Sequence, residues 1–500
     1  MTSPPTTAGT THVEVRTGAY ADSVTLLQVS KDVAAVPGVE NAQVAMATPL
    51  NLDVLASMGF ALPATTPNDM VVALKIGADG DLTAALAAVD AALSRKTRSA
   101  ERAEQEPHRT TGSAMADSDA DLALVSVPGE HAFVEAMDAL DLGRDVMVFS
   151  DNVPLEQEVA LKRRAADRGL LVMGPDCGTA VVGGVGLGFA NSTRPGPVGI
   201  VAASGTGCQQ LLCLLDAGGA GVSAALGVGG RDLSAEVGGL STREAMRRLD
   251  QDPTVELIVV VSKPPAEEVA ADLRALATTL GTPVEFALLG EGQPDLTVAA
   301  EKALEALGKP RPTWRTWGTG SAGSAARGYL RGLFVGGTLC DEAMLVAAAS
   351  LGPIRSNIPL SPELRLDTTL TAEAHTMVDF GDDELTSGRA HPMIDPTLRL
   401  EHLARTAADP STGVVLMDVV LGHGAEADPA ASLAPAIRQA RETARAAGRE
   451  LPVVVAVVGT EDDPQQLSLQ ATALAGAGAE VFLSNAQATR RAVDLTGGAR

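Results

Sequence analysis

The chain has 500 residues, which predicts three or four domains, and 45% hydrophobic against 20% charged residues indicates a core-forming protein. Only 2% of the residues are aromatic, which argues against a protein that stacks nucleobases on aromatic rings. The net charge of −24 repels phosphate backbones and anionic membranes.

The cysteines and the N-terminus indicate the cellular setting. The four cysteines, at positions 177, 208, 213 and 340, form no Cys-x-x-Cys pair, which is typical of a reducing compartment. Residues 1–11 are polar and lack the apolar core of a signal peptide, and no uncharged apolar run reaches 18 residues. We therefore expect a cytoplasmic protein that binds neither nucleic acid nor membrane.

The N-terminal unit reads as a strand over 12–16, a helix over 21–33, strands over 41–46 and 70–76, and a helix over 81–93. This order fits either the start of a nucleotide-binding domain or a small ferredoxin-like unit, and the pattern alone does not separate the two. A polar stretch over 95–119 ends the unit.

Beyond it, short β-branched apolar runs alternate with amphipathic helical stretches, which predicts a multi-domain α/β fold with parallel, doubly wound sheets. The runs are 122–127, 145–149, 170–173, 198–202, 256–261, 376–380, 414–420 and 452–458, and two of the helices are 155–168 and 431–447. Pro/Gly-rich breaks lie at 191–197 and 308–328. We expect domains over 1–115, 116–195, 196–307 and 329–500, with 308–328 as a linker.

Several strand ends carry residues suited to holding an anion. The run over 198–202 leads into Ser204, Gly205, Thr206 and Gly207 and then a helix, where free backbone N–H groups bind phosphate or carboxylate; ordinary N-capping is the alternative. Gly229, Gly230 and Arg231 suggest a backbone nest with a cation beside it, or a flexible loop. Lys263 follows another strand, where open α/β sheets bind ligands, or is a solvated loop lysine.

The second half repeats this pattern. Gly336, Gly337 and Thr338 join a strand to a helix and form a second candidate anion site. Downstream, His391 is the favoured proton shuttle and Arg389 a charge partner, although a single histidine more often fixes a turn. Asp379, with Asp382 and Asp383, could instead bind Mg²⁺. His423, between two glycines, is a further pocket candidate, and no zinc motif or other metal site is assigned.

These motifs, in their order and spacing, resemble the α subunit of succinyl-CoA synthetase over 174–261 and its β-subunit CoA-ligase module over 379–424. The chain as a whole resembles the FdrA family of that superfamily. The resemblance implies a Rossmann-like CoA-binding-type domain followed by two flavodoxin-like CoA-ligase domains. It also adds Asn152 and Asp176, which lie in motifs shared with the family, to the expected pocket.

The departures from a synthetase are specific. The stretch 286–296, where the resemblance places a phosphohistidine loop, contains no histidine, and its expected glutamate partner is Gln210. The turn over 16–20, placed at the CoA loop, has one glycine where the family has several. The resemblance therefore favours an FdrA-type transferase subunit of allantoin catabolism that moves a carbamoyl or acyl group between phosphate and an oxamate-like acid.

Two other hypotheses stay open: an NDP-forming acyl-CoA synthetase subunit and a non-catalytic scaffold. In the favoured one, Ser204–Thr206 and Gly229–Arg231 bind the anion, Lys263 and Arg389 balance charge, and His391 moves a proton. Partner subunits are expected, and the resemblance leaves CoA or a nucleotide with Mg²⁺ as the only cofactor candidates.

Overall fold

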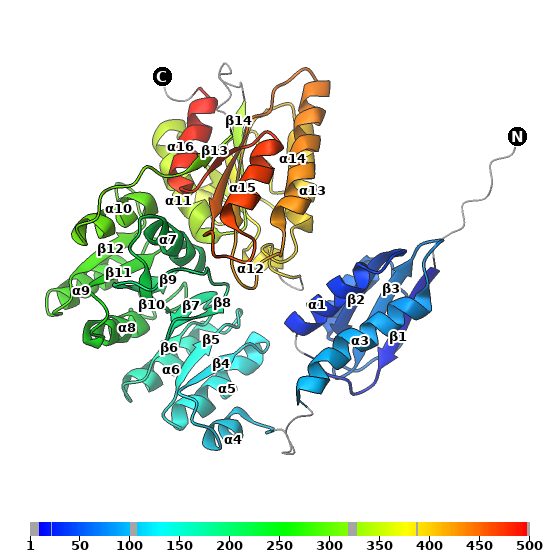
Figure 1. Cartoon of the computed structure of the whole chain (residues 1–500), viewed down its shortest axis with the longest axis horizontal. Helices are drawn as coiled ribbons and strands as arrows, with labels where there is room; N and C mark the ends of the chain where they lie inside the picture. The colour runs from blue at the N-terminus through cyan, green and yellow to red at the C-terminus, as the bar shows by residue number, and fades with distance from the viewer. Residues whose placement is uncertain (1–9, 22, 101–107, 319–327, 387–388, 498–500) are drawn as a thin grey trace, which may run out of the picture. The chain divides into compact units, whose positions relative to one another are not determined.

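The computed structural model describes residues 10–21, 23–100, 108–318, 328–386 and 389–497, and Figure 1 shows the ribbon. The chain forms two compact units: unit 1 ends at His108, and unit 2 contains almost all of the rest. The N-terminal segment 1–9, the middle of the expected linker, 319–327, and part of the polar stretch 95–119, 101–107, lie outside the described residues. Among the described residues no helix is long and apolar enough to cross a membrane.

Unit 1 is built on a three-stranded antiparallel sheet with the order β1-β3-β2. Helices α1 and α3 pack on one face of this sheet, and α2 packs on the other. Because nucleotide-binding domains have parallel sheets, the antiparallel pairing favours the ferredoxin-like alternative. The elements are β1 (Thr10–Arg16), α1 (Ser23–Ala34), β2 (Val39–Met46), α2 (Pro49–Ser57), β3 (Met70–Ile76) and α3 (Leu82–Ala100).

Unit 2 begins with a small parallel sheet, β4-β5-β6, with helices between its strands. This is a short Rossmann-like arrangement, in which β4 and β5 are each followed by a helix. Its elements are α4 (Thr111–Ala116), β4 (Leu122–Val125), α5 (Gly129–Asp141), β5 (Asp145–Val148), α6 (Leu155–Ala166) and β6 (Val172–Met173).

The second sheet has the order β12-β11-β9-β10-β7-β8. Strands β9 to β12 are parallel, and their order is that of a flavodoxin-like sheet. An antiparallel hairpin, β7 (Thr179–Val182) and β8 (Val185–Gly188), extends one edge. The remaining elements are β9 (Val198–Ala203), α7 (Gly205–Ala217), β10 (Val222–Gly227), α8 (Leu240–Gln251), β11 (Leu257–Ser262), α9 (Glu267–Ala277), β12 (Val284–Leu288) and α10 (Leu296–Ala306).

The third sheet, β13-β19-β18-β17-β14-β16-β15, repeats the flavodoxin-like order in its parallel strands. Its elements are β13 (Thr316–Trp317), β14 (Tyr329–Phe334), α11 (Gly337–Leu351), β15 (Arg355–Ser356), η1 (Pro362–Leu364), β16 (Thr376–Asp379), α12 (Asp383–Thr386), α13 (Thr397–Ala408), β17 (Thr412–Val420), α14 (Pro429–Ala446), β18 (Val453–Val458), α15 (Leu467–Gly476), β19 (Glu480–Phe482) and α16 (Asn485–Leu495).

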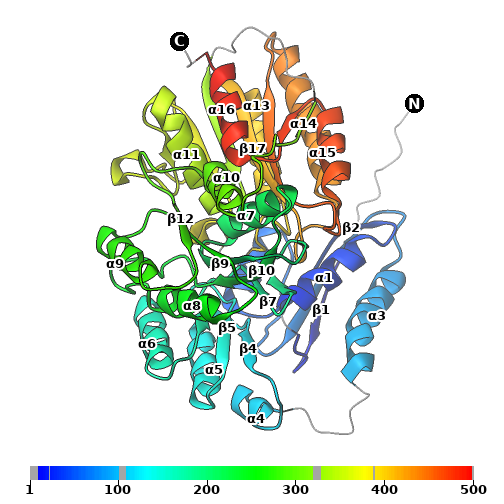
Figure 2. The ribbon, with the colours of Figure 1, turned by 60° about the vertical axis from the view of Figure 1, so that its left-hand side comes forward.

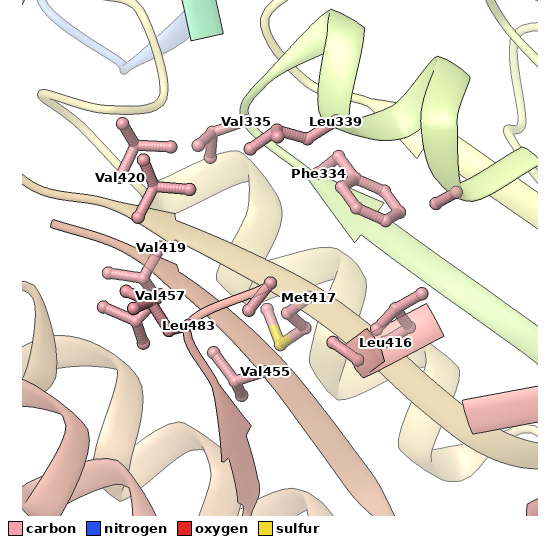
Figure 3. Packing of buried hydrophobic residues seen from close by; sticks show 14 of the residues in the cluster. Phe334, Val335, Leu339, Leu416, Met417, Val419, Val420, Val455, Val457 and Leu483 are labelled. Atoms are coloured by element: carbon pink, nitrogen blue, oxygen red, sulfur yellow. The ribbon is translucent and has the colours of Figure 1, made fainter. Parts of the chain in front are cut away.

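The two larger sheets share one hydrophobic core, in which helix α7 lies beside α10 and α11 (Figure 2). All nine residues of β17 are buried, because a central parallel strand is covered by helices on both faces. Figure 3 shows Leu416 and Met417 of this strand near Phe334 of β14 and Val455 of β18. This packing fixes the positions of the strand ends that form the site.

Candidate functional site

The site lies where the first helices of the two flavodoxin-like sheets meet. Helix α7 follows β9, and helix α11 follows β14. The Ser204 hydroxyl donates to Thr338 Oγ1 at 2.7 Å and accepts from the Gly207 amide at 3.0 Å. A Cβ on Gly336 would stand 2.9 Å from the side chain of Thr206, so the two helix starts approach this closely only because position 336 is glycine.

This meeting of helix starts is suited to an anion. The first-turn N–H groups of a helix have no partner within the helix, and its N-terminus carries a partial positive charge. Two such ends face one place here, and each adds its partial positive charge to the attraction for an anion. The sequence-predicted segments Ser204–Gly207 and Gly336–Thr338 therefore come together in one place.

Lys263 brings a cation to the same place. It follows β11, whose last residue Ser262 pairs with Ala203 at the end of β9; these adjacent strands lead to opposite sides of the sheet, which is where such folds bind ligands. Lys263 Nζ and Asp379 Oδ2 lie 3.1 Å and 2.8 Å from the point at which a Cβ on Gly337 would stand. A small ligand at the start of α11 would meet both groups.

The charge of the site is set by this lysine and two carboxylates. Burial raises the pKa of Asp379 to about 7, although Lys263 opposes that shift. Lys263 Nζ is 3.8 Å from Asp341 Oδ2. Surrounding protein lowers the pKa of Lys263, but Asp341 and Asp379 outweigh it and leave the pKa above its usual value. The lysine stays charged, and Asp379 can take or give a proton near neutral pH.

Asp176 stands on a small recess beside the start of α7. The recess is lined by Asp176, Cys177, Gly178, Thr179, Ala202, Ser204, Gly205, Gly227 and Gly229. Asp176 is exposed, and desolvation by the neighbouring protein together with the charge of Asp383 raises its pKa to about 7. Cys177 is buried, and burial raises the pKa of its thiol, so it is a poor nucleophile.

Sequence reasoning missed the residues that hold the α11 turn. Asp418 of β17 accepts from the amides of Val335 at 2.8 Å and Gly336 at 2.9 Å, and Arg399 donates to it at 3.1 Å. Burial raises the pKa of Asp418 to about 6, against the effect of Arg399. Asn357 similarly binds the backbone of Asp379. The sequence did contain a signal for Asp418, because it is the one carboxylate in the otherwise apolar run of β17.

His391 is a donor in this setting. Its Nδ1 accepts from the Met393 amide at 3.2 Å, and its Nε2 lies 2.8 Å from the point where a Cβ on Gly381 would stand. Burial lowers the pKa of His391 to about 4. At neutral pH the ring is uncharged, and with Nδ1 accepting, its proton is on Nε2, next to the Asp379 loop.

Arg231 and its glycines lie at a junction between domains. Arg231 pairs with Glu158 at 2.8 Å and donates to the Val153 carbonyl at 2.8 Å. Gly229 packs on the Gly174–Pro175 turn, whereas Gly230 has open space where a side chain would stand. The carbonyl of Asn152 packs against Gly129 at the start of α5. Through these contacts the segment Gly229–Arg231 joins the second sheet to the first.

The last two predicted residues lie elsewhere. His423 Nε2 is 3.2 Å from Ser192 Oγ in a separate groove, lined by Val181, Gly184, Gly186, Asn191, Ser192, Thr193, Pro195, Gly196, Pro197, Val222, Ser223, Thr254, Glu256 and His423. Arg389 is exposed, with no described contact to the other site residues. In the described part of the chain, no three His, Cys, Asp or Glu side chains are arranged to hold a metal ion.

Two family models match the chain. The model described as CoA-ligase matches residues 333–495, which contain α11, Asp379 and Asp418. The model described as AllF, heavy metal-associated domain, matches residues 8–109, which correspond to unit 1. The second match coincides with unit 1, and the first covers the third sheet within unit 2.

The chain is similar to several known proteins. YahF of Escherichia coli K12 is 39% identical over 491 residues, which are 93% of this chain and 95% of YahF. Subunit alpha 1 of the ADP-forming succinate–CoA ligase of Archaeoglobus fulgidus is 28% identical over 33% of this chain and 57% of that one. Subunit SauD of the ADP-forming sulfoacetate-CoA ligase of Bilophila wadsworthia is 27% identical over 33% and 58%. The chain thus spans little more than half of those two subunits.

Among solved structures, the dinucleotide-forming acetyl-coenzyme A synthetase 1 of Ca. Korarchaeum cryptofilum, in complex with phosphate and ADP, is 16% identical. The match covers 79% of this chain and 86% of that chain, with a TM-score of 0.31. A TM-score of that size carries no argument about the site.

The names of these relatives suggest two bound groups, a heavy metal ion and coenzyme A. The residues of unit 1 fit neither of them. Residues 1–108 contain no cysteine, so unit 1 lacks the thiolates that soft metal ions prefer. The turn over 16–20, which the resemblance aligned with a CoA loop, belongs to the separate antiparallel unit. In the first sheet, a Cβ on Gly129 would stand 2.2 Å from the Asp151 carbonyl, so the loop after β5 packs directly against the start of α5.

Proposed function

The chain belongs to the FdrA family within the succinyl-CoA synthetase (CoA ligase) superfamily. We propose that it is a subunit of a transferase of allantoin catabolism. This enzyme would move a carbamoyl or related acyl group between phosphate and an oxamate-like acid. The main observation behind this proposal is that two helix starts meet at Ser204 and Thr338, beside Lys263. Such a place stabilises the oxygens of a phosphoryl group.

The absence of a relay histidine supports transfer without a phosphoenzyme. A ligase that passes phosphate from nucleotide to acid needs a nucleophile to carry it. The loop after β12, residues 289–295, contains no histidine, and Gln210 is buried and bound to Leu483 and Asn485. The anion site then serves a substrate that already contains an acyl phosphate.

The chemistry of such a transfer balances without a redox partner. The amide nitrogen of the acceptor attacks the carbonyl carbon of carbamoyl phosphate, a C–N bond forms, and the bond between that carbon and the phosphate oxygen breaks. The nitrogen gives up one proton and inorganic phosphate leaves. Asp379, with its pKa of about 7, receives the proton, and Lys263 with the helix starts stabilises the leaving phosphate. Asp379 thus takes the proton-transfer role that the sequence had suggested for His391. The neutral His391 ring, with its proton on Nε2, is suited to donate a hydrogen bond to the developing oxyanion.

The proposal is tested in the reverse direction. The purified chain, alone and with each candidate partner subunit, is mixed with carbamoyl-oxamate and inorganic phosphate, and carbamoyl phosphate and oxamate are quantified. We expect turnover that Lys263→Met lowers at least 100-fold and that Lys302→Met, a change at an exposed position of helix α10, leaves intact. No turnover with any partner combination would overturn the transferase assignment.

A second candidate function is an NDP-forming acyl-CoA ligase subunit. It is favoured by the CoA-ligase family match and by similarity to subunits of succinate– and sulfoacetate–CoA ligases. A partner would supply the nucleotide-binding part, and the CoA would have to be held elsewhere than in the turn over 16–20. Calorimetry with CoA distinguishes the two functions: saturable binding favours the ligase, and no heat at millimolar CoA favours the transferase.

A further inference from the structure

Strand β1 forms an open edge of the sheet in unit 1. All seven of its residues pair with β3, and within the described residues no strand pairs with its other side. An unpaired edge presents a row of backbone N–H and C=O groups to another strand. Figure 1 shows β1 at one side of the unit 1 sheet.

Apart from its charged residues Glu14 and Arg16, the strand lacks the features that usually protect such an edge. It contains no proline, glycine or lysine, and its register with β3 runs without interruption from Thr10 to Arg16. The opposite edge strand, β2, differs: its register shifts between Val39 and Asn41, an irregularity that discourages further pairing. Of the two edges, β1 is the one built to accept a strand.

The sequence of β1 is complementary to itself in the register that pairs its full length. When two copies pair antiparallel about Val13, the middle residue, His12 of each copy stands opposite Glu14 of the other, and Arg16 stands opposite Thr10. Shifting the centre to Glu14 places two glutamates opposite each other, and shifting it to His12 places two histidines opposite each other. Centring the pair on Val15 sets Glu14 opposite Arg16 but overlaps only residues 14–16 of the strand. Opposite charges across a strand pair stabilise it and like charges destabilise it, so the central register, which pairs the whole strand, is favoured.

His12 supplies a second, independent observation. Its Nε2 atom is shielded from solvent and has no hydrogen-bond partner, and the nearest carboxylate oxygen, Glu14 Oε2 of its own strand, is 3.8 Å away. That distance is too long for a hydrogen bond. In the central register the Glu14 of a second copy stands directly opposite His12, and its carboxylate binds Nε2 once the ring, which is 30% exposed, turns toward the edge of the sheet.

We propose that unit 1 is a self-association domain, in which β1 of two chains pair antiparallel about Val13 to form one continuous six-stranded sheet. The partner is a second copy of this chain, and the activity sites of unit 2 play no part in the contact.

The test uses a cysteine at the centre of the pair. In Val13→Cys, the introduced thiols of two chains face each other within the ~5 Å between opposed Cβ atoms, and the four native cysteines are buried. Treated with a short bifunctional thiol reagent, the full-length variant is expected to form a covalent dimer on a denaturing gel. Gln43→Cys, on the opposite edge strand β2, is the matched control. Cross-linking of Val13→Cys no greater than that of the control overturns the proposal.

The charge register is tested by mass in solution. The wild-type chain is expected at twice 50.9 kDa, whereas His12→Glu, which sets glutamates opposite Glu14 at two places, is expected at one chain mass. His12→Glu combined with Glu14→His restores opposite pairs and is expected to restore the dimer. Gln43→Glu adds the same charge on β2 and leaves the dimer intact. A monomeric wild type, or a dimer that His12→Glu does not weaken, overturns the proposal, and circular dichroism of each variant verifies that the fold is kept.

Discussion

The hydroxyl of Ser204 donates to the hydroxyl of Thr338 across 2.7 Å, and each side chain belongs to the first turn of a different domain's first helix. Ser204 also caps its own helix by accepting from Gly207. One hydrogen bond therefore fixes the distance between two helix N-termini, and with it the size of the space in which an anion can be held between them.

The link between these hydroxyls should appear in stability. Ser204→Ala removes a helix cap, worth about 1 kcal/mol, and leaves the buried Thr338 hydroxyl without its donor, which costs about 1–3 kcal/mol more. Thr338→Val removes the same bond from the other side. Because both changes break one bond, the double variant should lose less stability than the sum. Urea unfolding followed by the fluorescence of Trp314 and Trp317, both in unit 2, measures this; full additivity would contradict the coupling.

Much of the fold could be predicted because its signals are local. The β-branched runs predicted β9, β11, β17 and β18 to within two residues at each end, since buried parallel strands need continuous apolar sequence. The antiparallel β7–β8 hairpin and helix α2 were not predicted, because a short hairpin with four glycines nearby and a nine-residue helix led by proline have weak periodicity.

The site was predictable in its parts and not in its assembly. Glycine-rich turns after strands identified the starts of α7 and α11, but the sequence gives no sign that residues 134 positions apart, Ser204 and Thr338, touch. Nor could it show that Arg231 is held by the buried Glu158. Such contacts depend on how whole sheets pack, which no short-range pattern encodes.

A methyl group at Gly337 should block the anion site while leaving the fold intact. In Gly337→Ala, the new Cβ would stand 2.8 Å from Asp379 Oδ2 and 3.1 Å from Lys263 Nζ, so it displaces the side chains that face a ligand. We expect at least a tenfold weaker stabilisation of the protein by inorganic phosphate in a thermal-shift titration. Gly476→Ala, on helix α15 with open space around it, is the control that should bind phosphate normally.

The pH dependence of stability should reveal Asp379. Its pKa is about 7 in the folded chain and near 3.8 when unfolded, so between these values the folded state holds more protons and its stability falls as pH rises. Asp379→Asn removes this loss. The stability of the variant relative to wild type should therefore increase from pH 4 to pH 7 and stay level above pH 7, as unfolding midpoints at each pH would show. A flat difference would mean that Asp379 is ionised throughout.

His391 should act in the opposite sense. Burial holds its pKa at about 4, below the usual 6.5, so between these values the unfolded chain binds more protons and stability falls as pH drops. His391→Gln keeps a neutral donor near the ring position and removes this sensitivity. Wild type should lose stability relative to the variant from pH 6.5 down to pH 4, and the phosphate-binding pH profile above 6.5 should be the same for both. A profile above 6.5 that His391→Gln changes would show that the ring is charged there.

The junction between the first and second sheets should depend on one buried lysine. Lys162 is fully buried and donates to Glu158 at 2.8 Å, Asp232 at 2.7 Å and the Val228 carbonyl at 2.8 Å. Lys162→Met leaves two buried carboxylates without that cation, which costs about 3–5 kcal/mol. Arg164→Met, on the same helix but in an exposed pair with Asp141, should cost no more than about 1 kcal/mol. Equal losses of unfolding free energy for the two variants in urea would mean that other groups compensate the buried carboxylates. A loss specific to Lys162→Met would identify the buried cluster as the connection that holds Arg231 and its neighbouring glycines in place.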